Sequence, residues 1–133
     1  MKYVAAYVAA AVMFGITDAV WLTTMTPLLY QPALGPILAE QPNIAPAVVF
    51  YLLYIAGIVI LAVAPALKDG GWKRAALMGA VFGLIAYATY DLTNQATLKI
   101  WATKVTVLDM TYGALATSLA AVVAFLAARR VAK

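Results

Sequence analysis

The sequence contains no cysteine and no histidine, and only 11% of its 133 residues are charged. Without these two residue types the chain has no disulfide bond, thiol nucleophile, Cys/His zinc site or histidine-ligated haem. Soluble domains carry roughly 25% charged residues. A chain that is 66% hydrophobic lacks the polar surface that water requires. The composition therefore excludes a soluble enzyme domain, a disordered tail, a disulfide scaffold and a DNA-binding module, and it predicts an integral membrane protein.

Four apolar runs are long enough to span a bilayer. They extend from Tyr3 to about Met25, from Pro46 to Leu67, from about Trp72 to Asn94 and from about Thr106 to Ala128. A hydrocarbon core of ~30 Å requires ~20 helical residues, and backbone groups in lipid must be hydrogen-bonded within the protein, so each run is expected to be a helix. We predict an all-α membrane protein in which residues 1–133 form a single domain, a bundle of four transmembrane helices.

The two ends of the first run raise separate questions. The run continues past Asp18 and contains no A-x-A cleavage site, so we expect a retained helix rather than a cleaved signal peptide. The following connection, residues 26–45, contains four prolines but is otherwise rich in Leu, Ile and Ala. A structureless loop of this length is improbable in a compact protein. We therefore predict an ordered lid in the outer interface, with one or two short helical turns.

The basic residues predict the orientation, because cytoplasmic segments are enriched in Lys and Arg. The net charge is +4, and the basic residues stand at the ends of the apolar runs rather than in one cluster. They therefore indicate topology and attraction to membrane lipids, and nucleic acid is not expected as a partner. With the N-terminus inside, seven basic residues are cytoplasmic and two are outside. The seven are Lys2, Lys68, Lys73, Arg74, Arg129, Arg130 and Lys133, and the two are Lys99 and Lys104. Both termini are thus predicted to face the cytoplasm.

Three aspartates fall within or beside the apolar runs: Asp18, Asp91 and Asp109. A charged group in a membrane helix costs at least ~2.5 kcal/mol on insertion scales, so each is a candidate functional residue. Counted from the inner face at helical rise, Asp18 lies ~22 Å deep and Asp91 ~24 Å deep. Asp109 stands in the predicted first turn of the fourth helix, at its outer end. All three carboxyl groups are therefore expected in the outer third of the bilayer.

Amphipathic side chains gather at the same depth. Tyr87, Tyr90 and Asn94 share one stripe of the third helix, Trp21 is near Asp18, and Tyr112 follows Asp109 by one turn. We expect Asp18, Asp91 and Asn94 to face one another with one proton or one cation held between the carboxyl groups, because two carboxylates in a low-dielectric site are not both ionised. The candidate binding residues are Asp18, Trp21, Tyr87, Tyr90, Asp91, Asn94, Asp109 and Tyr112.

Each of these features also has a purely structural interpretation. Asp109 is a possible partner of the helix macrodipole, and tyrosines and tryptophans near helix ends are typical of the interfacial belt. Asp18 is compatible with polar contacts between helices, and Asp91 with Asn94 is compatible with an interhelical hydrogen-bond network. Gly79 and Gly83 form a GxxxG pattern, which indicates close packing either within the bundle or at a dimer face.

One run has a more specific pattern. The segment from Tyr90 to Trp101, YDLTNQATLKIW, resembles the Y-D-L-T-N-x-A-T-L-x-x-W signature of a bacterial membrane family known as domain of unknown function 2177. Asp18–Leu22, Phe50–Tyr54 and Asp109–Met110 followed by Gly113 also match, so the resemblance covers essentially the whole chain. The resemblance implies a small four-helix, multi-pass protein of the bacterial inner (cytoplasmic) membrane. It implies no particular activity. Tyr112 departs from the family, which more often has Trp there.

Three classes of function fit the sequence. The first is binding or translocation of a small molecule or cation at an outer carboxylate and aromatic pocket, where four helices would make a thin wall and favour a homo-oligomer. The second is a lipid-modifying membrane enzyme, with the aspartates as general acid and base or as ligands of a divalent metal ion. The third is an accessory subunit of a membrane complex. The sequence indicates no cofactor and no resident metal ion, and it leaves the ligand open.

Overall fold

The computed structural model describes residues 1–133 and contains four helical segments long and apolar enough to cross a membrane. This confirms the predicted all-α, four-helix membrane fold. The first segment comprises α1 (Lys2–Met25), the π turn η1 (Thr26–Tyr30), α2 (Gln31–Leu34) and the 3₁₀ turn η2 (Gly35–Ile37). The second comprises α3 (Ile44–Ile58), the π turn η3 (Val59–Val63) and α4 (Ala64–Lys68). The third is α5 (Gly71–Thr97), and the fourth is α6 (Thr103–Val131).

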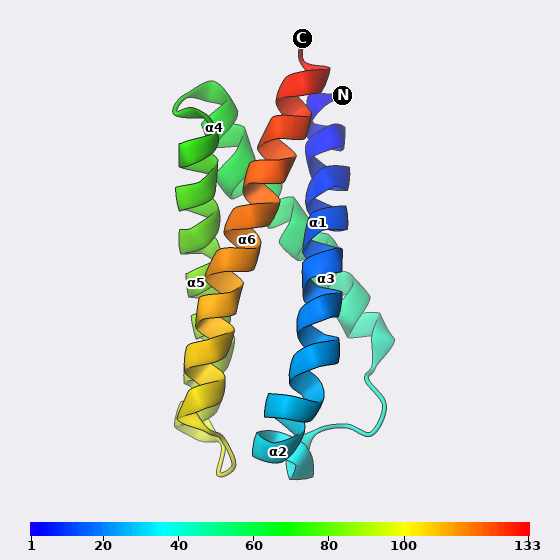
Figure 1. Ribbon diagram of the computed structural model, residues 1–133, viewed down its shortest axis with the longest axis vertical. Helices are drawn as coiled ribbons and strands as arrows, with labels where there is room; N and C mark the ends of the chain where they lie inside the picture. The colour runs from blue at the N-terminus through cyan, green and yellow to red at the C-terminus, as the bar shows by residue number, and fades with distance from the viewer.

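Both termini lie at the same end of the elongated bundle, as an even number of spans requires (Figure 1). The α4–α5 turn is also at this end, where Gly70 and Gly71 adopt positive φ angles of 98° and 66° that L side chains disfavour. The opposite end, which we call the far end, carries α2 and the α5–α6 connection. Helix α6 is the central element and packs along both α5 and α1.

Glycines bring α5 and α6 into close contact. A Cβ atom on Gly79 would lie 2.8 Å from the Cβ of Ala121 and 2.9 Å from the Thr117 carbonyl oxygen. A Cβ on Gly83 would collide with the Gly113 carbonyl. The GxxxG pattern therefore serves packing within the bundle, which was one of its two interpretations.

The half of the bundle nearest the termini has an apolar core. Its fully buried side chains are mostly small or branched, so the helices approach closely. Among the fully buried members are Ala6, Ala10, Ile58, Ala62, Val63, Ala75, Ala120, Ala124 and Ala128. The buried side chains of this half are therefore mainly apolar.

The first helical segment does not stop at Met25. Pro27 has no N–H to donate, and the backbone widens there into a π turn and continues in helical turns to Ile37. Leu29 and Leu34 are buried with Val105 of α6. The predicted lid is therefore ordered. It contains more helix than the one or two turns expected, and this helix is continuous with α1. Only residues 38–43 of the lid are without helix.

The second span leans across the bundle, and Figure 1 shows α3 starting well to one side at the far end. Its contacts with α5 and α6 are made mainly by η3 and α4, whereas α3 itself touches chiefly α1. Val49, Leu52 and Leu53 are consequently exposed. The far end of the bundle is therefore open sideways, between α3 and the other helices.

Candidate functional site

A cavity of about 770 Å³ lies at the far end, between the spans and beneath the segment that links α1 to α3. We call it the far-end cavity. All four spans contribute to it, because the leaning α3 leaves space that side chains only partly fill. Its lining consists of Asp18, Trp21, Leu22, Thr26, Tyr30, Gln31, Leu34, Leu38, Ala39, Glu40, Pro42, Phe50, Tyr51, Ala86, Tyr87, Tyr90, Asp109 and Tyr112.

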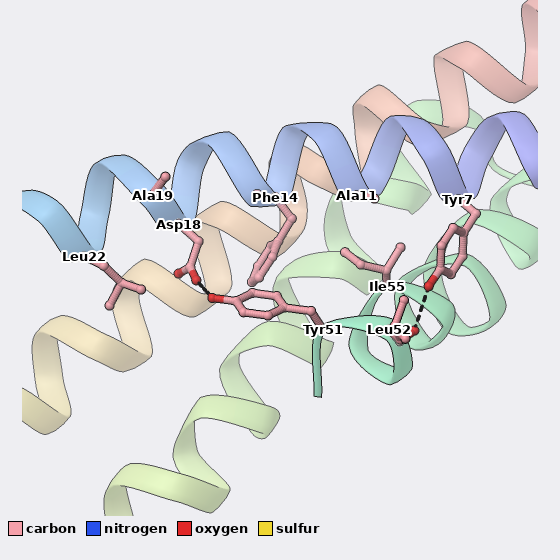
Figure 2. A pocket seen from close by; sticks show the side chains of 10 residues that line it. Tyr7, Ala11, Phe14, Asp18, Ala19, Leu22, Tyr51, Leu52 and Ile55 are labelled. Carbon is pink, nitrogen blue, oxygen red and sulfur yellow. Dashed lines mark hydrogen bonds between the residues drawn. The ribbon is translucent and has the colours of Figure 1, made fainter. Parts of the chain in front are cut away.

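Asp18 of α1 is held on the cavity wall by two tyrosines. Tyr51 of α3 donates a hydrogen bond to one carboxylate oxygen, as Figure 2 shows, and Tyr112 of α6 donates to the other at 2.9 Å. The residue is only 7% exposed. These two donors replace water around the carboxylate, which lowers the cost of burying it.

Asp109 of α6 is bound by the lid. Tyr30 of η1 donates a hydrogen bond to the Asp109 carboxylate, and the Trp21 indole N–H donates to the Tyr30 hydroxyl at 2.8 Å. Helix α6 begins at Thr103, so Asp109 is in its second turn and the first turn has no acidic residue. The prediction of a first-turn carboxylate on the macrodipole was therefore wrong, because the dipole effect fades within the first turn.

Asp91 of α5 is fully buried, at 0% exposure, and neither carboxylate oxygen has a hydrogen-bond donor. The neighbouring acidic group is the carboxyl group of Asp109. Asp18 is held by tyrosines and interacts only at longer range with Asp109. Asp91 is thus a neighbour of Asp109, a pairing that the sequence analysis did not name, and the expected facing of Asp18 and Asp91 stays a prediction.

The aromatic candidates form much of the cavity wall. Trp21 stacks on Tyr112 with ring centroids 4.2 Å apart and an interplanar angle of 10°. Tyr87 meets Tyr112 edge-on at 5.9 Å. Tyr90 also lines the cavity, although it is 56% exposed. Asn94 is half-buried and, unlike the tyrosines, does not line the cavity.

A separate polar network closes the α5–α6 connection. The Trp101 indole donates to the Thr106 hydroxyl at 2.9 Å, and this hydroxyl donates to the side-chain oxygen Oε1 of Gln95 at 2.7 Å. The Gln95 amide in turn donates to the Thr103 hydroxyl at 3.0 Å. These bonds position the start of α6, and with it Asp109.

The cavity residues that were not among the candidates chosen from the sequence include Tyr30, Tyr51 and Glu40. The tyrosines were recognisable, because a phenol in an apolar segment requires a hydrogen-bond partner once buried. Glu40 lies in the part of the lid without helix, residues 38–43, and reaches the cavity only through the path of that stretch. No pattern in the sequence indicates that path.

All the charged side chains that line the cavity are acidic. Asp18, Glu40 and Asp109 line it together with seven aromatic side chains, and no lysine or arginine does. The acidic residues are spread over the wall, and no three of them are grouped closely enough to hold a metal ion. The three-aspartate metal site considered for an enzyme therefore has no counterpart in the structure.

These features define a small four-helix membrane protein with an acidic, aromatic cavity at one end. The family model "Predicted membrane protein (DUF2177)" matches residues 3–126, so the chain belongs to this family. The resemblance seen in the sequence is thereby confirmed. No curated protein and no solved structure matches the chain.

Proposed function

We propose that the protein binds a small organic cation in the far-end cavity. The observation that carries this proposal is the lining, which combines three carboxyl groups with seven aromatic rings and no basic side chain. Carboxylates attract a cation, and tyrosine and tryptophan faces stabilise alkylated ammonium groups by cation–π interaction. An anionic ligand would meet only like charge there.

The carboxyl groups are placed to act on such a ligand. Asp18 and Asp109 are held by tyrosine hydroxyls, so their positions are set before a ligand arrives. Preorganised groups lose little side-chain entropy on binding. Glu40, in the non-helical part of the lid that leads to α3, is exposed and supplies a further charge near the opening.

The apolar core below the cavity supports binding at one end rather than conduction through one chain. The ligand would enter and leave at the far end, which the count of seven basic residues against two orients away from the cytoplasm. In this proposal the protein is in the bacterial inner membrane with both termini cytoplasmic. It presents the cavity to the outer leaflet.

Tetramethylammonium is a suitable probe. Its binding to the protein in nanodiscs would be measured for the parent, Asp109→Asn and Asp69→Asn. Asp69 is the matched control, because its side chain is 86% exposed and lies in the α4–α5 turn at the other end. Asp109→Asn should weaken binding about tenfold, the typical effect of losing one charged partner, and Asp69→Asn should not. Equal affinity of the parent and Asp109→Asn would contradict the proposal.

A further inference from the structure

A second hollow, of about 450 Å³, lies between α1 and α3. We call it the α1–α3 groove. Two hydrogen bonds bridge the helices at its ends, one from Tyr51 to Asp18 and one from Tyr7 to the Leu52 carbonyl at 3.0 Å. Figure 2 shows both bonds, with Phe14 and the other apolar side chains between them. Eight of its ten lining residues are hydrophobic, so the groove suits a hydrocarbon chain.

The small residues of α1 give the groove its depth. Ala11, Gly15 and Ala19 recur every four residues and line one face of the helix. The groove runs from Tyr7 to Asp18, a separation of 18 − 7 = 11 residues and therefore ~16 Å at helical rise. Each carbon of an extended chain advances about 1.3 Å, given C–C bonds of about 1.5 Å. About twelve carbons fit this length.

The groove is continuous with the far-end cavity, because Asp18, Leu22 and Tyr51 line both. The apolar α1–α3 groove and the acidic, aromatic far-end cavity thus meet at the Asp18 carboxylate. Since α3 leans away from the bundle, the groove opens sideways between two spans. In a bilayer, an amphiphile reaches both hollows without leaving the membrane.

We propose that the ligand is a cationic amphiphile with a single hydrocarbon chain of about twelve carbons. Its charged head lies in the far-end cavity against Asp18 and Asp109, and its chain lies in the α1–α3 groove. This inference rests on the proposed cation site and adds a binding site for the hydrocarbon chain of the ligand. The two parts are separable by experiment, because a short cation occupies only the cavity.

The test compares dodecyltrimethylammonium with tetramethylammonium, both at low mole fraction in nanodiscs. Gly15→Leu fills the groove, and it should fold, because a Cβ at Gly15 meets nothing within 4 Å. Since overfilling a packed site carries a substantial penalty, dodecyltrimethylammonium should bind about tenfold more weakly to Gly15→Leu, whereas tetramethylammonium should be unaffected. Val12→Phe is the control, because Val12 is 56% exposed on the same helix and lies outside the groove.

Each outcome has one meaning. Weakening of the long cation alone, by Gly15→Leu alone, supports the groove assignment. Equal binding of the long cation to the parent and Gly15→Leu overturns it and leaves the cation site standing, provided that tetramethylammonium binds. If tetramethylammonium fails to bind the parent, the proposed function itself fails. A photoreactive group at mid-chain of the long cation gives a readout on the parent protein, with labelling of α1 and α3 expected and labelling elsewhere contradicting the assignment.

Discussion

Tyr51 of α3 donates a hydrogen bond to the Asp18 carboxylate of α1, and this contact stands where the α1–α3 groove meets the far-end cavity. Tyr112 of α6 donates to the same carboxylate at 2.9 Å. Three spans are thus joined through one buried acidic group. Asp18 therefore links the structure of the far end to its proposed ligand chemistry, and the two roles can be separated by substitution.

Asp18→Leu should destabilise the protein more than Asp18→Asn. Leucine leaves the hydroxyls of Tyr51 and Tyr112 without an acceptor, while asparagine keeps an oxygen and most of the shape. The expected difference is about 2 kcal/mol, from two buried hydroxyls that lose their partner. Unfolding of both variants in mixed detergent micelles measures it. Equal unfolding free energies would show that the two bonds add nothing to stability.

Tyr30→Phe should loosen the lid. The Tyr30 hydroxyl is the donor to Asp109 and the acceptor for Trp21, so its removal breaks the chain of bonds between η1 and α6. Amide exchange over residues 26–37 should become about tenfold faster, as expected for the loss of one hydrogen bond to a charged group. Tyr3→Phe is the control, because that side chain is 44% exposed near the N-terminus. An unchanged rate of amide exchange in Tyr30→Phe would show that the Tyr30 hydroxyl does not hold the lid to α6.

The sequence predicted the spans and the depth of the acidic residues, because both depend on counting residues along a helix. The last three spans agree with the apolar runs to within a few residues, whereas the first continues to Ile37, beyond the predicted end at Met25. Asp18, Asp91 and Asp109 are all in the far-end halves of their helices. The GxxxG pattern likewise indicated close approach, since only glycine leaves room for a neighbouring backbone.

The sequence did not predict which carboxyl groups would be neighbours. Counting residues along a helix gives the height of a carboxyl group in the bundle. Which carboxyl groups become neighbours depends also on which face each helix turns toward the bundle interior. In a soluble bundle the polar face marks the outside, but here the lipid-facing side is as apolar as the core. Val81 and Leu84, exposed on α5, are as hydrophobic as its buried residues. The rotation of α5 that brings Asp91 to Asp109 is set by glycine packing on α6.

Gly79→Leu should destabilise the bundle, whereas Gly15→Leu should not. A side chain on Gly79 meets the α6 backbone within 3.0 Å, while Gly15 has open space. Overpacking of this kind typically costs about 1–3 kcal/mol, and the loss should appear as a lower melting temperature and as aggregation on size-exclusion chromatography. The same melting temperature for both variants would contradict the close α5–α6 packing.

Single cysteines at Ala132 and Thr103 should be labelled from opposite sides of the membrane. The chain has no cysteine of its own, so each variant reports one position. Ala132 follows α6 near the termini, and Thr103 begins α6 at the far end. A membrane-impermeant maleimide added to intact spheroplasts should react with the cysteine at position 103 and spare that at 132. Reaction of both from one side would overturn the four-span topology, and the reverse pattern would overturn the orientation.

Binding of the cation should release a proton from Asp91 and Asp109. Two adjacent carboxyl groups away from water are not both ionised without a large cost, and Asp91 has no other donor. A proton shared between the two carboxyl groups would give Asp91 a hydrogen bond to Asp109 when no cation is bound. A cation beside Asp109 favours the fully ionised pair, so the proton leaves. Protons and the cation therefore compete, and affinity should rise with pH.

This linkage can be measured by tetramethylammonium titrations over a range of pH values, because two coupled carboxyl groups bind and release protons as one unit. Affinity should increase by up to tenfold per pH unit, because one proton leaves for each cation bound. Asp91→Asn removes the shared proton and should flatten the pH dependence, while binding at high pH changes only a few-fold because Asp109 remains. Asp69→Asn should keep the slope of the parent. Constant affinity across this range, with no proton released into a weakly buffered solution, would show that the buried pair takes no part in binding.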